Sequence, residues 1–219
     1  MATFADRSEA GRRLAKELTE YGGRDDVVVL GLPRGGVPVA FEVAKELQVP
    51  MDVYVVRKLG VPGREELAMG AIASGGVRVL NEDVVGSMSI SDEDIERVAE
   101  REREELERRE QAYRGARPHI DLEGKVILLV DDGLATGATM TAAVRAVRTQ
   151  DPQRVVVAAP TAPPDTCGEF EDLVDEIICL ETPRFFMGVG GAYDDFSQTS
   201  NEEVREYLER IDDVLDGDE

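Results

Sequence analysis

The sequence predicts an α/β fold built on a doubly wound, mostly parallel β-sheet. Short apolar runs alternate with segments of helical periodicity along most of the 219 residues. The runs at 27–32 and 126–130 are apolar throughout, which is typical of parallel strands buried on both faces. Strand, helix and strand in this order imply right-handed crossovers within one sheet. Because no linker or internal repeat interrupts the pattern, we expect residues 1–219 to form a single domain.

The first half of the chain contains five expected elements. A helix, a strand, a second helix, a second strand and a hairpin are predicted at residues 6–21, 27–32, 38–47, 51–56 and 71–80. Gly22-Gly23 ends the first helix, and Pro38 lies in the first turn of the second, where proline is tolerated.

Residues 91–114 differ from the rest of the chain because they are mostly Glu and Arg, with opposite charges four residues apart. Their apolar stripe is thin and consists of Ile95, Ala99, Leu106 and Tyr113. This composition predicts a charged helical arm that protrudes from the core. A solvated surface helix without chemistry is the simplest interpretation, and contact with a partner subunit is the alternative.

The regular alternation resumes after this arm. Strands are predicted at 126–130, 154–159 and 176–180, and helices at 138–148 and 165–173. Ser200 and Glu203 form a capping box for a last helix. We expect residues 181–219, together with the N-terminal end, to form a small hood beside the sheet.

The composition excludes several function classes. Lys and Arg number 25 against 46 Asp and Glu, a net charge of −21, so nucleic acid and anionic membranes are poor partners. An acid-rich, lysine-poor surface suits a high-salt cytoplasm, and ordinary acidity is the alternative. No apolar run is long enough to cross a bilayer and no signal-peptide pattern occurs, so we expect a cytoplasmic protein. Cys167, Cys179 and His119 are too few for a disulfide framework or a Cys- or His-rich metal site.

The most informative segment is 126–140, in which a buried strand is followed by Asp131 and Asp132, a short loop and a helix. The backbone N–H groups of the loop and the helix N-terminus form a natural phosphate cradle. Two carboxylates beside a phosphate suit the vicinal hydroxyls of a sugar. The segment therefore predicts a pocket for a ribose 5-phosphate, with an ordinary strand-to-helix turn as the alternative.

This segment resembles the phosphoribosyl-pyrophosphate signature of the type I phosphoribosyltransferase family, in which apolar residues precede two acids and Thr-Gly-x-Thr. Nearly the whole chain resembles an uncharacterised group of predicted phosphoribosyltransferases. The resemblance implies that Asp131 and Asp132 hold the ribose hydroxyls. It assigns the 5-phosphate to the loop residues Ala135, Thr136, Gly137, Ala138 and Thr139.

Two further segments fit the family. The resemblance implies that Arg34, Gly35 and Gly36, after the first strand, form a pyrophosphate loop, in which glycines permit close approach and strained dihedrals. Arg57 and Lys58 are expected at the end of the next strand, where they would also meet pyrophosphate. In so acidic a chain these cations would create a local region of positive electrostatic potential. Arg34 and Lys58 are expected to have catalytic roles. A mobile catalytic loop is expected after Lys58.

The segment 183–196 loosely resembles the base-binding region of hypoxanthine–guanine phosphoribosyltransferases. By that analogy Phe185 or Phe186 would stack on the base, and Asp194 or Asp195 would lie near the base and metal. The alternative is a glycine-rich turn whose aromatic side chains, such as Tyr193, pack in the core.

The resemblance implies a Mg²⁺-dependent enzyme that displaces pyrophosphate from phosphoribosyl pyrophosphate with a nucleobase. Asp131 and Asp132 would contribute to the metal site indirectly. We expect a purine acceptor and a homodimer, but which purine stays open. Ala135 occupies the position of an aspartate in the 6-oxopurine enzymes, and the loop is closer to the adenine pattern. The alternatives are a regulatory protein that binds the same ligand without turnover and another phosphoribosyl or phosphate chemistry in the same pocket.

Overall fold

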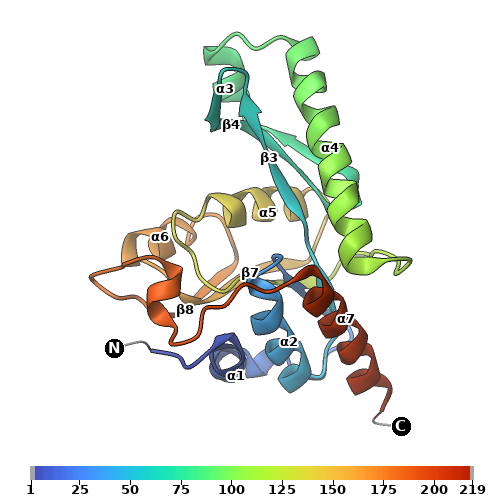
Figure 1. The fold of residues 1–219 in the computed structure, drawn as a ribbon, viewed down its shortest axis with the longest axis vertical. Coiled ribbons are helices and arrows are strands. Elements are labelled where there is room, and N and C mark those ends of the chain that lie inside the picture. The colour runs from blue at the N-terminus through green and yellow to red at the C-terminus, as the bar shows by residue number, and fades with distance from the viewer. Residues whose placement is uncertain (1–2, 218–219) are drawn as a thin grey trace.

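A five-stranded parallel sheet forms the centre of the protein, as the computed structural model of residues 3–217 shows (Figure 1). Its strands are β1 Val27–Gly31, β2 Met51–Val53, β6 Val126–Val130, β7 Arg154–Thr161 and β8 Glu176–Glu181. They lie in the order β2-β1-β6-β7-β8, and each neighbouring pair is parallel. The predicted doubly wound sheet is confirmed. Its strand order reverses between β1 and β6, and ligands bind at such a switch point, at the carboxyl ends of the strands.

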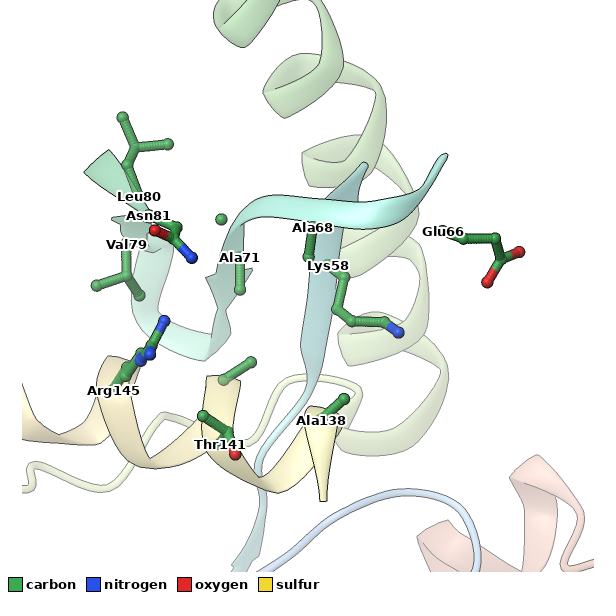
Figure 2. A pocket seen from close by; sticks show the side chains of 12 residues that line it. Lys58, Glu66, Ala68, Ala71, Val79, Leu80, Asn81, Ala138, Thr141 and Arg145 are labelled. Atoms are coloured by element: carbon green, nitrogen blue, oxygen red, sulfur yellow. The ribbon is translucent and has the colours of Figure 1, made fainter. Parts of the chain in front are cut away.

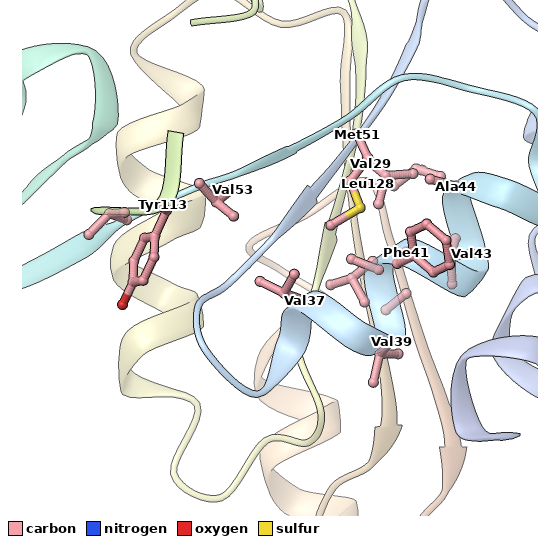
Figure 3. Packing of buried hydrophobic residues seen from close by; sticks show 14 of the residues in the cluster. Val29, Val37, Val39, Phe41, Val43, Ala44, Met51, Val53, Tyr113 and Leu128 are labelled. Atoms are coloured by element: carbon pink, nitrogen blue, oxygen red, sulfur yellow. The ribbon is translucent and has the colours of Figure 1, made fainter. Parts of the chain in front are cut away.

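Helices cover both faces of this sheet. One face carries α1 Arg7–Glu17, α2 Gly36–Leu47 and α7 Asn201–Asp216, and the other carries α5 Ala138–Arg148 and α6 Pro164–Glu169. Successive strand residues point to opposite faces, so the sheet contributes to two hydrophobic clusters. Val29 and Leu128 pack near Phe41 of α2 (Figure 3), whereas Ile127 belongs to the cluster that contains Val144 of α5.

A second, antiparallel sheet stands at one end of the parallel sheet (Figure 1). It consists of β3 Val56–Val61, β4 Arg64–Ala73 and β5 Val77–Leu80, followed by α3 Glu82–Ser87 and α4 Asp92–Arg114. The predicted hairpin at 71–80 is confirmed as part of it. The single strand predicted at 51–56 is wrong, because β2 ends at Val53 and β3 begins at Val56. The apolar run continues through this break since the connecting residues are buried as well.

The α4 helix has nearly the predicted bounds, but it is not a solvated arm. Ile95, Ala99, Leu106 and Tyr113 are all buried, in a cluster that includes Leu59 of β3. The thin stripe suffices because one narrow face of the helix packs on the small antiparallel sheet. The prediction of a surface helix is therefore wrong for that face.

The two ends of the described chain pack against each other, as the expected hood requires. Phe4 forms a parallel bridge with Tyr193, and its N–H donates to the carbonyl of Ala192 over 2.9 Å. The predicted capping box of Ser200 and Glu203 is present at the start of α7. These contacts bring the first turn of α1 beside the segment that precedes α7.

A single disulfide, which the cysteine count did not predict, joins Cys167 of α6 to Cys179 of β8. Short 3-10 turns lie at Thr19–Tyr21, Ser74–Gly76 and Val189–Ala192. The predicted helix at 165–173 ends at Glu169. Within residues 3–217, no helix combines the length and the apolar character that a membrane crossing requires.

Candidate active site

The acidic pair follows β6 at the switch point of the parallel sheet. Asp131 Oδ1 accepts the backbone N–H of Asp132 over 2.8 Å, and Asp132 Oδ2 accepts Arg7 Nε over 2.8 Å. Among the described residues, no N–H or O–H donor is hydrogen-bonded to Asp131 Oδ2 or Asp132 Oδ1, although the two carboxyl groups also interact with each other. Each carboxylate thus keeps one oxygen that is able to accept a hydrogen bond from a ligand.

Burial makes the ionised forms of these two carboxyl groups less favourable. Desolvation raises the pKa of Asp131 well above the ordinary aspartate value, and the negative charge of Asp132 raises it further. Desolvation also raises the pKa of Asp132, although the hydrogen bond and the positive charge of Arg7 oppose that rise. A ligand that donates hydrogen bonds or brings positive charge would relieve the repulsion between the two acids.

The predicted phosphate loop connects the acidic pair to α5, which begins at Ala138. Gly137 has a φ of 67°, a left-handed conformation that favours glycine, and a Cβ there would meet Phe170 at 2.8 Å. Thr166 of α6 donates its hydroxyl hydrogen to the carbonyl of Ala135 over 3.1 Å. Helix α6 therefore contacts the loop and holds it in place. Ala135 and Thr136 of the loop are exposed. Ala138 and Thr139, in the first turn of α5, are exposed as well.

The expected pyrophosphate loop lies directly against the acidic pair. A Cβ on Gly35 would lie 2.1 Å from Asp132 Oδ2, and a Cβ on Gly36 would lie 2.8 Å from Asp131 Cα. Both glycines are thus required by close packing on the acids. The expected strained dihedral is not found at Gly35, whose φ of −63° and ψ of −33° are ordinary helical values. Arg34, the residue before Gly35, is exposed and follows a cis peptide bond to Pro33.

Lys58 lies in the middle of β3 rather than at a strand end, yet the fold brings it to the phosphate loop. It lines a cavity of about 230 Å³ between the antiparallel sheet and α5, together with Ala138 and Arg145 (Figure 2). Arg57 is directed elsewhere, because Glu102 of α4 accepts its Nε over 2.9 Å. The predicted cluster of both cations at one strand end is therefore wrong, since adjacent residues of a strand face opposite sides.

The C-terminal segment separates the residues that were expected to bind the base. Phe185 is 91% exposed, and it lines a cavity of about 200 Å³ with Phe186 and Thr161. Asp194 and Asp195 are exposed and do not line that cavity. Their backbone N–H groups instead tie this segment to the N-terminal end of the chain.

Two residues that the sequence did not single out for the site contact the acidic pair. Arg7 of α1 forms the ion pair with Asp132 described above, and the hydroxyl of Tyr193 donates to the carbonyl of Asp132 over 2.5 Å. Tyr193 is buried, as a packing residue would be, and it holds the acidic pair as well. No local pattern marks Arg7, which is one of many charged residues in its helix.

Comparison with known proteins agrees with this geometry. A family model described as the phosphoribosyl transferase domain matches residues 5–195. The chain belongs to the phosphoribosyl transferase domain family. It is similar to proteins of Mycobacterium tuberculosis strains CDC 1551 / Oshkosh and ATCC 25618 / H37Rv, each named a "putative phosphoribosyl transferase". Each is 50% identical over 210 residues, covering 96% of this chain and 47% of the relative, so the chain spans about half the length of these relatives.

A solved structure extends the comparison to the fold of this phosphoribosyl transferase domain. The crystal structure of TT1426 from Thermus thermophilus is 42% identical, with a TM-score of 0.86. The match covers 96% of this chain and 99% of that one. The parallel sheet and the second lobe, which consists of the antiparallel sheet with α3 and α4, therefore have a close counterpart in a chain of similar length.

Proposed function

We propose that the protein is a phosphoribosyltransferase that displaces pyrophosphate from phosphoribosyl pyrophosphate with a nucleobase. One observation carries the proposal. Two partly buried carboxylates at the switch point, each with an oxygen left for a ligand, stand directly before a loop that is exposed at Ala135 and Thr136 and leads into α5. The 2- and 3-hydroxyls of ribose would donate to Asp131 and Asp132, and the 5-phosphate would accept from the N–H groups of the loop.

In the proposed reaction, the bond from C1 of the ribose to a pyrophosphate oxygen breaks, and a bond from C1 to a ring nitrogen of the base forms. The ribose gains positive charge in the transition state, while the leaving pyrophosphate gains negative charge. The acidic pair would fix the sugar and offset its positive charge. Arg34, next to Gly35 in the loop that packs on the acids, and Lys58 of β3 would stabilise the pyrophosphate.

Magnesium fits these residues as a cation that is held mainly by the substrate. Among the described residues, no group of three or more Asp, Glu, His or Cys side chains forms a ready metal cage. Mg²⁺ commonly takes one or two carboxylates and fills its other positions with water and phosphate oxygens. Asp131 and Asp132 would supply that carboxylate contact. When bound, Mg²⁺ neutralises part of the charge on pyrophosphate.

The acceptor is proposed to bind in the cavity lined by Phe186 and Thr161. Thr161 links this cavity to the acidic pair, because a Cβ on Gly133, the residue after Asp132, would lie 3.0 Å from Thr161 Cγ2. Among the described residues, its lining contains aromatic side chains, Met187 and small residues, and no charged side chain. Such a lining suits a neutral ring, and a purine is our proposed acceptor.

Pyrophosphate release tests the proposal. The protein is incubated with phosphoribosyl pyrophosphate, Mg²⁺ and each of a panel of purine and pyrimidine bases, at low and at molar salt. Release that depends on one base supports the transferase and identifies its acceptor. Saturable binding without release for any base would favour a regulatory protein instead. The double variant Asp131→Asn/Asp132→Asn should fold and lose binding, and unchanged affinity in it would contradict the pocket.

A further inference from the structure

Helix α6 contacts the phosphate loop, residues 135–139, through two side chains. The hydroxyl of Thr166 donates to the carbonyl of Ala135 over 3.1 Å. The ring of Phe170, directly after α6, lies against Gly137, where a Cβ would meet it at 2.8 Å. Thr166 and Phe170 are both buried. A shift of α6 would therefore move the loop or remove its support.

The disulfide fixes α6 in this position. It joins Cys167, the residue after Thr166, to Cys179 of β8. With six residues, α6 is too short to be stable as an isolated helix, and Pro163 at its start provides no side-chain cap. Among the described strands, β8 is an edge strand that pairs with β7 alone. The covalent link thus connects a marginal helix to the rim of the sheet, and through Thr166 it also steadies the loop.

Both cysteines are partly exposed, so a small thiol is able to reach the sulfur atoms. We propose that Cys167 and Cys179 form a thiol–disulfide exchange site that sets the affinity of the phosphate loop. The disulfide form holds the loop in place for the 5-phosphate, whereas the reduced form releases α6 and binds phosphate more weakly. This inference rests on the proposed function, because that function places a phosphate at the loop.

The exchange partner is a neutral dithiol. One of its thiolates attacks a sulfur of the Cys167–Cys179 bond, which breaks as a mixed disulfide forms. The second thiol of the reagent then displaces the protein sulfur and closes a cyclic disulfide. The protein gains two electrons and two protons, and the reagent loses the same number. Because the chain has a net charge of −21, an anionic thiol such as glutathione should react more slowly than a neutral dithiol.

The first test uses the ligand-free protein, so it does not depend on binding or activity. Amide hydrogen exchange is measured by mass spectrometry before and after treatment with dithiothreitol, and the intact mass, which rises by two hydrogens, confirms reduction. The reporters are the N–H groups of Leu134 and Thr141, which flank the loop and donate to the carbonyls of Thr161 and Gly137. The control reporter is the N–H of Gly36, in the loop that packs on the acidic pair.

We expect reduction to accelerate exchange at Leu134 and Thr141 several-fold and to leave Gly36 unchanged. The double variant Cys167→Ser/Cys179→Ser should show the fast exchange without the reagent and no response to it. Unchanged exchange at Leu134 and Thr141 would overturn the proposal. An equal acceleration at Gly36 would also overturn it, because that result indicates a general loss of stability.

The second test measures the affinity for phosphoribosyl pyrophosphate with Mg²⁺ by calorimetric titration. Because the reduced protein has to order its loop on binding, reduction should weaken the affinity at least about fivefold, and reoxidation should restore it. Equal affinity in the two forms would overturn the proposal. Absence of binding in both forms would remove the proposed function, whereas the exchange experiment would still report the coupling of the disulfide to the loop.

Thr166→Val tests the route from the disulfide to the loop, because it removes the hydrogen bond to Ala135 and keeps both cysteines. It should weaken binding in the oxidised protein, and reduction should then have a smaller effect than in the wild type. An undiminished effect would overturn the proposed route. If the reduced protein does not fold, Thr166→Val and Phe170→Leu, compared in the oxidised state, test the same coupling, and wild-type affinity in both would overturn the proposal.

Discussion

Alanine at Gly36 and alanine at Gly35 should have different effects, because different kinds of atoms oppose the new methyl group. At Gly36 the Cβ would lie 2.8 Å from both Asp131 Cα and the Val130 carbonyl oxygen, which are backbone atoms that cannot yield. At Gly35 it would meet Asp132 Oδ2 at 2.1 Å, the end of a side chain. We therefore expect Gly36→Ala to damage the fold and Gly35→Ala to damage mainly the site.

Overpacking costs about 1–3 kcal/mol, and Gly36→Ala should lie at the upper end of that range. The backbone at Gly35 is already helical, so alanine there regains about 0.4–1 kcal/mol by restricting the unfolded chain. The net loss of stability should then be about 0–2 kcal/mol. The displaced carboxylate loses its hydrogen bond to Arg7, so the affinity for phosphoribosyl pyrophosphate should fall at least about tenfold.

Urea unfolding and calorimetric titration measure these two effects separately. Gly86→Ala, in α3, is the matched control, because a Cβ there would meet no atom within 4 Å. It should leave binding unchanged and stability equal or slightly higher. Wild-type affinity in Gly35→Ala would refute the placement of Asp132, and a Gly36→Ala protein as stable as the control would refute the close packing.

Four other outcomes follow from the structure. The raised pKa of Asp131 makes its ionised form unfavourable in the folded state, so Asp131→Asn should raise the Tm at pH 8. The gain should shrink as the pH falls and vanish below the ordinary aspartate pKa of 3.8, where Asp131 is protonated in both states. Arg114→Met should lower the free energy of unfolding in urea by about 3–5 kcal/mol, because Asp52, 1% exposed and 3.0 Å from Arg114 Nη1, loses its partner. Ser200→Ala should cost about 1 kcal/mol in the same assay through loss of the cap. Molar KCl should raise the Tm by screening the net charge of −21, and a flat Tm would indicate ordinary acidity.

The parallel sheet and the phosphate-binding segment could be predicted from the sequence, because the residues that indicate them are neighbours in the chain. A strand buried on both faces needs a continuous apolar run, as in β1 and β6, whatever lies next to it. Asp131, Asp132 and the loop that follows are consecutive in the chain. Their spacing from the strand and from α5 is therefore visible without any tertiary contact.

The second lobe was harder to predict because its elements depend on one another. The break between β2 and β3 falls within an apolar run, and only the pairing of β3 with β4 shows where one strand ends. The partner of Arg57 is Glu102 of α4, a helix whose composition alone predicts a solvated arm.

The sequence by itself determined the sheet, the acidic pair and the loop after it, because each is encoded within a dozen neighbouring residues. Only the tertiary structure decided what holds the pair in place. Arg7 and Tyr193 come from opposite ends of the chain and meet at Asp132 because α1 and the segment before α7 pack together. Contacts between residues so far apart depend on the packing of whole elements, and that packing leaves no periodic trace in the sequence.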